Sequence, residues 1–126
     1  MDKFYTQVID NCIVIISLEG DLLGQENEAQ IITYVEHDLP PHIVMAAVDI
    51  SKVAYMNSSG LTVLIRLLTK FRNRNGDLVL VHPSDSVKKL LLITKLNQIF
   101  YVFDTKQAAV EYLKQIQPTT TDSSVA

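Results

Sequence analysis

The run IVMAAVDI, residues 43–50, is the feature that most limits how this chain can fold. Seven of its eight residues are apolar. Successive side chains of a strand point to opposite faces of a sheet, so a strand with this composition is buried on both faces. Such strands lie at the centre of sheets that helices cover. The run therefore predicts a helix-covered sheet of the α/β class.

The segments around this run alternate between strand and helix patterns. Two β-type runs broken at Asn11 predict a hairpin with Asp10 and Asn11 at its turn. Further strands are expected at DLVLV and IFYVF. Helices are expected at 25–38, from residue 61 to the C′ residue Gly76, after Ser84, and after Asp104 or Thr105. The order β-β-α-β-α-β-α-β-α predicts an α/β fold with a mixed sheet of four or five strands and about four helices.

The length and composition fit one globular domain. The chain has 126 residues, of which 48% are apolar and 20% are charged. We expect residues 1–116 to form the domain, and 117–126, which are polar and lack periodicity, to form a flexible tail. No apolar stretch approaches the roughly 18 residues of a membrane-spanning helix. The expectation is a monomer that does not enter a membrane.

Several function classes are disfavoured by charge and residue types. A net charge of −3 argues against a general nucleic-acid binder. The single cysteine, Cys12, lies in an apolar run, where we expect it to be buried; a lone thiol forms no internal disulfide and indicates the cytoplasm. The three histidines have no metal-ligand spacing, so no metal or other cofactor is expected. Neither the G-x-S-x-G motif of hydrolases nor a P-loop is present.

The segment MNSSGL, residues 56–61, joins the central strand to the clearest helix pattern. In parallel sheets, ligands and partners bind at such loops. A helix N-terminus has unpaired N–H groups and a partial positive charge. Three roles follow for Asn57, Ser58 and Ser59. One of them caps the helix, an anion binds there, or a serine carries a phosphate that the same N–H groups tolerate.

The chain from about residue 5 to 116 resembles the STAS domain of bacterial anti-sigma factor antagonists. The resemblance rests on an ordered set of motifs: VIISLEGDLL, VDIS, MNSSGL, GDLVLV, VKKLLLITKL and IFYVFDTKQAA. It implies that Ser58, or alternatively Ser59, is phosphorylated. The expected kinase is also the anti-sigma factor and has the histidine-kinase-like ATPase fold. The unphosphorylated antagonist binds this kinase and so frees a sigma factor or another client, and a PP2C-type phosphatase resets the switch.

In this interpretation the domain is a substrate and a binding partner, and not an enzyme. We expect its partner-binding surface to contain Asp21, Leu22, Leu23, Tyr55, Met56, Asn57, Ser59, Gly60 and Leu61. Of Tyr55 and Met56, one is expected in the core and the other on the surface. Gly60 either allows the close approach of a partner or of the adjacent strand, or is simply tolerated early in the helix.

The sequence departs from the family pattern at two places. Asn57 replaces the usual Asp before the phosphorylated serine, and GDLLGQ replaces the usual GELD segment. Two alternatives therefore remain: a STAS scaffold subunit, or a module that senses an anion or nucleotide at the same helix start. Asp49 and Ser51, which end the central strand, either form hydrogen bonds within the loop or support the phosphorylation loop.

Overall fold

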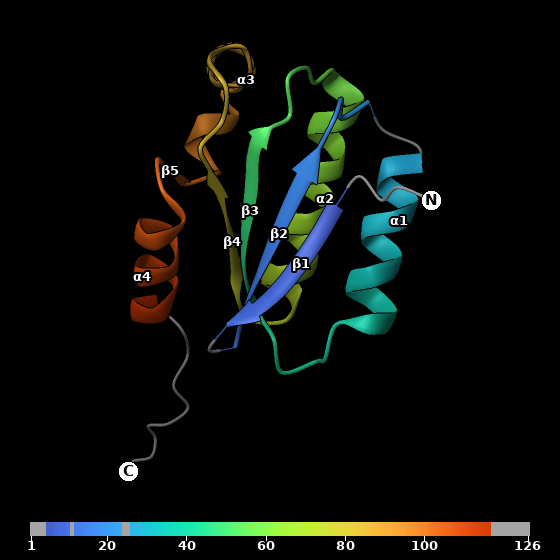
Figure 1. Ribbon diagram of the computed structural model, residues 1–126, viewed down its shortest axis with the longest axis vertical. Helices are drawn as coiled ribbons and strands as arrows, with labels where there is room; N and C mark the ends of the chain where they lie inside the picture. Colours follow the sequence, from blue (N-terminus) through green and yellow to red (C-terminus); the bar gives the residue numbers. More distant parts are fainter. Residues whose placement is uncertain (1–4, 11, 24–25, 117–126) are drawn as a thin grey trace.

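The computed structural model describes residues 5–10, 12–23 and 26–116. Its sheet has five strands in sequential order, with bounds β1 Tyr5–Asp10, β2 Ile13–Glu19, β3 Met45–Lys52, β4 Asp77–Val81 and β5 Val102–Phe103 (Figure 1). β1 pairs antiparallel with β2, and the other neighbours pair in parallel. The mixed sheet predicted from the sequence is confirmed. The tail expected at 117–126 lies outside the described residues.

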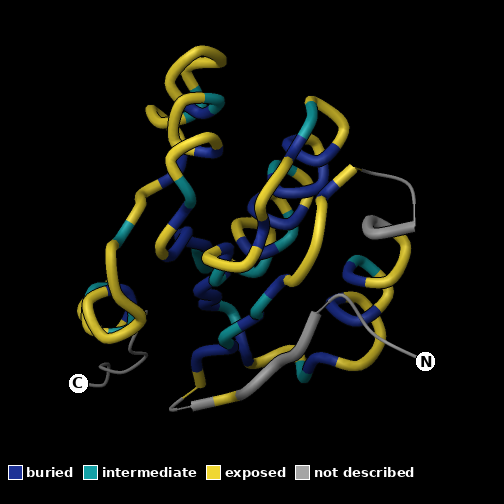
Figure 2. Tube along the Cα trace, turned by 45° about the horizontal axis from the view of Figure 1, so that its top comes forward, coloured by how far each residue is buried: buried dark blue, intermediate teal, exposed yellow. Residues whose placement is uncertain are grey.

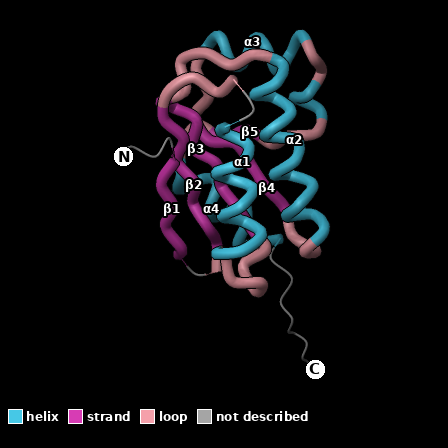
Figure 3. Tube along the Cα trace, turned by 90° about the vertical axis from the view of Figure 1, so that its right-hand side faces the viewer, coloured by secondary structure: helices cyan, strands magenta, loops and turns pink. Residues whose placement is uncertain are grey.

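The helices alternate with the strands in the predicted order. Their bounds are α1 Glu26–Thr33, α2 Ser58–Asn73, α3 Asp85–Ile93 and α4 Lys106–Ile116. A π-helical turn, Tyr34–Asp38, continues α1, and a short 3₁₀ turn, Leu96–Gln98, follows α3. Side chains of α1, α2 and α3 share one core with the sheet, and side chains of α4 share another. In the side view of Figure 3, β1, β2 and β3 lie at the left and α2 at the right. None of these helices has the length and apolar character that crossing a membrane requires.

β3 is buried on both faces, as its sequence predicts. Ala46, Val48 and Ile50 belong to a large core that also includes side chains of α1, α2 and α3. Met45 and Ala47 face a smaller core, which α4 closes with Ala109 and Leu113. Figure 2 shows this burial along the central strands. The alternation follows from the two-residue period of a strand.

The structure corrects the expectation that Cys12 is buried. Asp10 pairs with Ile13 at the end of the hairpin, so Asp10 belongs to β1 and Cys12 to the turn. Cys12 has a φ of 67° and is exposed. A positive φ is common in tight hairpin turns, and Cys12 therefore lies outside the strands that face the cores. IFYVF also forms a shorter strand than expected, because only Val102 and Phe103 pair with β4.

The end of α2 differs from the sequence prediction by one position. Asn75, with a φ of 67°, occupies the left-handed C′ position that was expected for Gly76. The Gly76 N–H donates to the Phe71 carbonyl and the Asn75 N–H to the Arg72 carbonyl, which is a Schellman motif. Gly76 is required for another reason. A Cβ there would lie 1.7 Å from the Val44 carbonyl oxygen.

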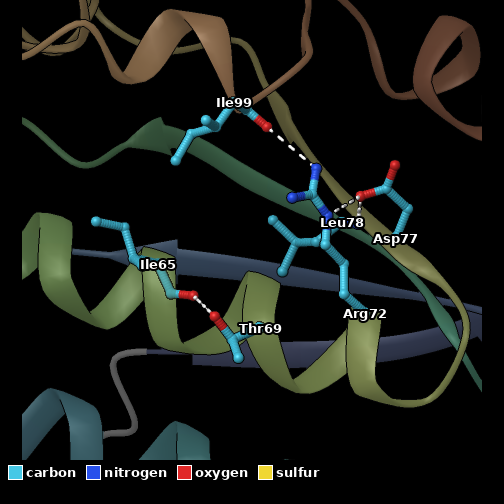
Figure 4. Close-up of polar contacts among 6 residues, drawn as sticks. All are labelled: Ile65, Thr69, Arg72, Asp77, Leu78 and Ile99. Atoms are coloured by element: carbon cyan, nitrogen blue, oxygen red, sulfur yellow. Dashed lines mark hydrogen bonds and ion pairs between the residues drawn. The ribbon is translucent and has the colours of Figure 1, made fainter.

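Arg72, in the last turn of α2, contacts the start of β4 and the segment before β5. Its guanidinium lies 3.5 Å from an Asp77 carboxylate oxygen at the start of β4 and 3.5 Å from the Ile99 carbonyl oxygen (Figure 4). Nearer the middle of α2, the Thr69 hydroxyl donates to the Ile65 carbonyl within the same helix. The position of α2 on the sheet follows from its seven buried residues, which pack in the large core.

Candidate functional site

Asn57 is the cap of α2. Its backbone is extended, with φ −105° and ψ −175°, and its Oδ1 accepts a hydrogen bond of 2.8 Å from the Gly60 N–H. This pairs one of the N–H groups that a helix start leaves unpaired. Of the three polar residues that the sequence offered for this task, Asn57 performs it. Ser58 and Ser59 are then the first two helical residues.

The hydroxyls of Ser58 and Ser59 are left without a structural task. Both residues are exposed, and no hydrogen bond involving either hydroxyl is found within the described residues. The backbone of Ser58 does have a partner, because its carbonyl accepts a hydrogen bond of 3.1 Å from the Thr62 hydroxyl. Ser58 therefore has a fixed main chain and a side chain that a second protein can reach.

The loop at residues 21–23 lies directly against the segment before Ser58. The Leu22 N–H donates to the Tyr55 carbonyl at 3.0 Å, and the Asn57 N–H approaches the Leu22 carbonyl at 3.4 Å. Leu22 and Met56 form an isolated parallel bridge. The loop therefore lies against residues 55–58, which we name the switch segment because the family resemblance implies phosphorylation of Ser58.

Gly60 makes the contact between this loop and α2 possible. A Cβ at this position would lie 2.0 Å from the Leu22 carbonyl oxygen and 2.9 Å from the Met56 side chain. Of the two interpretations open from the sequence, close approach is the one realised. The group that approaches Gly60 is the Leu22 carbonyl of the protein's own 21–23 loop, and not a partner.

Exposure divides the residues expected to contact a partner. Asp21, Leu23, Tyr55, Ser58 and Ser59 are exposed, and Asn57 is half-buried. The side chains of Leu22, Met56 and Leu61 belong to the large core, and Gly60 is buried too. This corrects the expectation for these last four: packing of α2 against the 21–23 loop removes them from the surface, so they shape it from below. Tyr55 and Met56 divide between surface and core as expected.

Asp49 is held within the structure at the end of β3. Its Oδ1 accepts from the Ser51 N–H at 2.9 Å, and its Oδ2 lies 3.4 Å from the Lys106 ammonium on α4. Burial raises the pKa of the Asp49 carboxyl, but the Ser51 hydrogen bonds and Lys106 outweigh this effect and lower the pKa overall. Of the two roles left open by the sequence, local hydrogen bonding is observed, but it lies at the end of β3, to which both residues belong, and not in the loop.

A groove beside the switch segment was not predicted from the sequence. It has a volume of about 310 Å³ and is lined by Tyr55, Met56, Asn57, Ser86, Val87, Lys89, Leu90 and Ile93. Its two walls are far apart in the sequence, which is why a motif did not indicate it. The one sign of the groove in the sequence was an apolar residue, Ile93, outside the predicted apolar stripe of its helix, and the structure shows that Ile93 is exposed. The described residues contain no group of three side chains that would suit a metal ion.

The model of the STAS domain family matches residues 3–109. The match covers the sheet, the loop at 21–23, the switch segment and the groove. The chain belongs to the STAS domain family. The matched region includes the exposed Ser58 at the start of α2.

Relatives and solved structures agree with this assignment. The anti-sigma-B factor antagonist of Listeria monocytogenes is 34% identical over 59 residues, which are 47% of this chain and 52% of the relative. The chain spans about half the length of the curated relatives it matches.

Two solved structures share the fold at low identity. The Bacillus cell fate determinant SpoIIAA in its phosphorylated form has a TM-score of 0.64 at 18% identity, covering 86% of this chain and 97% of SpoIIAA. A sulfate transporter family protein from Wolinella succinogenes has a TM-score of 0.71 at 17% identity, covering 86% and 89%. Because the fold occurs in both kinds of protein, the site must decide between functions.

Proposed function

We propose that this STAS domain is an anti-sigma factor antagonist whose binding is switched by phosphorylation of Ser58. The observation that carries the proposal is the exposed Ser58 hydroxyl at the first residue of α2. Asn57 makes the capping hydrogen bond, so Ser58 can be modified without loss of that bond. The named function of the Listeria relative supports the same role.

The local structure suits a phosphate that leaves the fold intact. A phosphoserine carries about −1.5 to −2 charges, and a helix N-terminus stabilises negative charge. Because α2 is packed by seven buried residues along its length, we expect no rearrangement of the helix. The protein already carries a net charge of −3. The modification therefore changes the charge of one surface and leaves the core as it was.

The exposed residues around Ser58 form the proposed contact surface. Tyr55 and Leu23 provide apolar area, and Asp21 lies on the same loop as Leu23. Tyrosine is enriched at protein interfaces, and contacts near the centre of an interface contribute most to binding. A phosphate on Ser58 would bring a dianion into this centre, and removing water from that dianion costs free energy. Changing a complex from 99:1 to 1:99 requires about 5.5 kcal/mol of differential affinity.

The proposed partner is an anti-sigma factor that is also the serine kinase, with the histidine-kinase-like ATPase fold. A PP2C-type phosphatase would restore the binding form. The domain acts as a substrate and a ligand and catalyses no reaction of its own. Regulation of a sigma factor would place these encounters in the cytoplasm.

The test is a pair of substitutions at Ser58, with Ser59→Ala as the matched control. We expect Ser58→Ala to bind its cognate kinase with the affinity of the unphosphorylated protein and Ser58→Asp to bind at least tenfold more weakly, measured by calorimetry. Phosphorylation by the kinase and ATP should disappear in Ser58→Ala and persist in Ser59→Ala, as mapped by mass spectrometry. Equal affinity of the Ala and Asp variants would rule out the switch. Phosphate on Ser59 alone would move it by one residue.

A further inference from the structure

The groove beside the switch segment is open and largely apolar. Tyr55 stands on one wall with 58% of its surface exposed, and Ile93 on the other with 78% exposed. Between them, Val87 is buried and Leu90 half-buried. Exposed apolar side chains that gather at a groove mark interaction sites more often than isolated ones do.

The charge of the groove is positive. Lys89 is its one charged lining residue within the described part of the chain, and no carboxylate lines it there. Lys89 is exposed, so its ammonium can meet a carboxylate from outside. An occupant that fits these walls presents an apolar side chain with an acidic group next to it.

The groove and the switch segment form one continuous surface. Asn57 lines the groove and also caps the helix that begins with Ser58. On the opposite wall, the Ser86 hydroxyl donates to the Ala54 carbonyl at 3.2 Å, which ties the first turn of α3 to the loop before Ser58. A protein that covers Ser58 can therefore also contact the groove without any change in the backbone of the STAS domain.

We propose that the groove is a second docking element for the partner that binds at Ser58. It receives an apolar side chain of that partner, and Lys89 pairs with a neighbouring carboxylate. This inference rests on the proposed function and adds a division of labour to it. Phosphorylation of Ser58 decides whether the partner binds, and the groove contributes to the affinity for that partner.

The test uses two pairs of neighbouring residues on α3 in the Ser58→Ala background. Ile93→Asp and Lys89→Glu alter the groove, whereas Leu92→Asp and Lys88→Glu make the same changes at exposed residues that do not line it. The probe is the purified anti-sigma factor kinase that binds Ser58→Ala. We expect about tenfold weaker binding for Ile93→Asp and weaker, less salt-dependent binding for Lys89→Glu. The two control variants should bind within about twofold of the background.

The outcomes separate the two proposals. If the kinase binds Ser58→Ala and rejects Ser58→Asp, but Ile93→Asp and Lys89→Glu bind normally, the groove proposal is wrong and the switch stands. If Leu92→Asp and Lys88→Glu weaken binding as much, the contact is the outer side of α3 and the groove proposal is again wrong. If no anti-sigma factor kinase of the source organism binds Ser58→Ala, both proposals fall. All four side chains are exposed, and equal melting temperatures will show that each variant is folded.

Discussion

Two neighbouring residues at the start of α2, Asn57 and Ser58, differ in what their side chains do in the structure. The amide of Asn57 pairs the Gly60 N–H, while the hydroxyl of Ser58 faces solvent. An aspartate at this position could accept the same hydrogen bond but would add a negative charge beside the phosphate that we propose on Ser58. Asn57 provides the cap without that charge.

Asn57→Ala should destabilise the protein by about 0.5–2 kcal/mol, because the cap is lost and the Gly60 N–H is left unpaired. Ser58→Ala should change the free energy of unfolding by less than about 0.5 kcal/mol, as for other exposed residues without contacts. Urea denaturation followed by circular dichroism measures both. Equal destabilisation by the two substitutions would contradict the assignment of the cap. Asn57→Asp, which preserves the acceptor, is the conservative control.

Capping at this helix could be predicted from the sequence, but the capping residue could not. Asn and Ser are preferred at this position to a similar degree, and three of them follow one another here. Which of the three residues becomes the cap depends on where the segment after β3 ends and α2 begins. The bridge between Leu22 and Met56 holds this segment in place. That bridge joins residues 34 positions apart, so local sequence carries no signal for it.

At the scale of elements, the site is a contact between the 21–23 loop and the first turn of α2. Gly60 sets their separation. An alanine in place of a helical glycine normally adds about 1 kcal/mol of stability. Here the new Cβ would lie 2.0 Å from the Leu22 carbonyl oxygen, so backbone must move.

Gly60→Ala should therefore destabilise the protein, because overpacking of this kind costs about 1–3 kcal/mol and outweighs the gain in helix propensity. It should also weaken partner binding, since the loop carrying Asp21 and Leu23 is displaced. Thermal unfolding and calorimetry with the kinase measure the two effects. Ser59→Ala, one residue earlier and exposed, is the control. A more stable Gly60→Ala variant would show that the loop yields freely.

The groove illustrates what element-level prediction leaves out. The helix after Ser84 and its Ser84 cap could be predicted, and the Ser84 hydroxyl does accept from the Val87 N–H. The position of that helix against Tyr55 could not, since it depends on how Val87 and Leu91 pack in the large core, with a further contact from Ser86 to Ala54. Residues of different elements form a groove only once the packing of the sheet has set their distances.

At the scale of the whole molecule, one sheet serves two cores of unequal size. The large core contains side chains of three helices, and the small one depends on α4 alone. The order of elements followed from alternating strand and helix patterns, which is why the topology could be predicted. Backbone angles at Cys12 and Asn75 could not, because a positive φ is decided by the geometry of each turn.

Leu113→Ala tests whether the small core is part of one cooperative unit. Leu113 is fully buried against the sheet, so its truncation should cost about 2–5 kcal/mol. Because β3 belongs to both cores, we expect a single unfolding transition with an unchanged dependence on urea. Ile116→Ala, in the same helix but exposed, should have little effect. Two separate transitions would show that α4 unfolds on its own.

The turn between β1 and β2 offers a practical consequence. The chain contains one cysteine, and it is exposed there. β2 and β3 run in parallel, so the start of β2 and the end of β3 lie at opposite ends of the sheet. A maleimide dye would therefore attach at a single site, away from Ser58 and from the groove. With this dye, the unaltered protein can be used in single-molecule fluorescence to follow binding and release of the proposed partner.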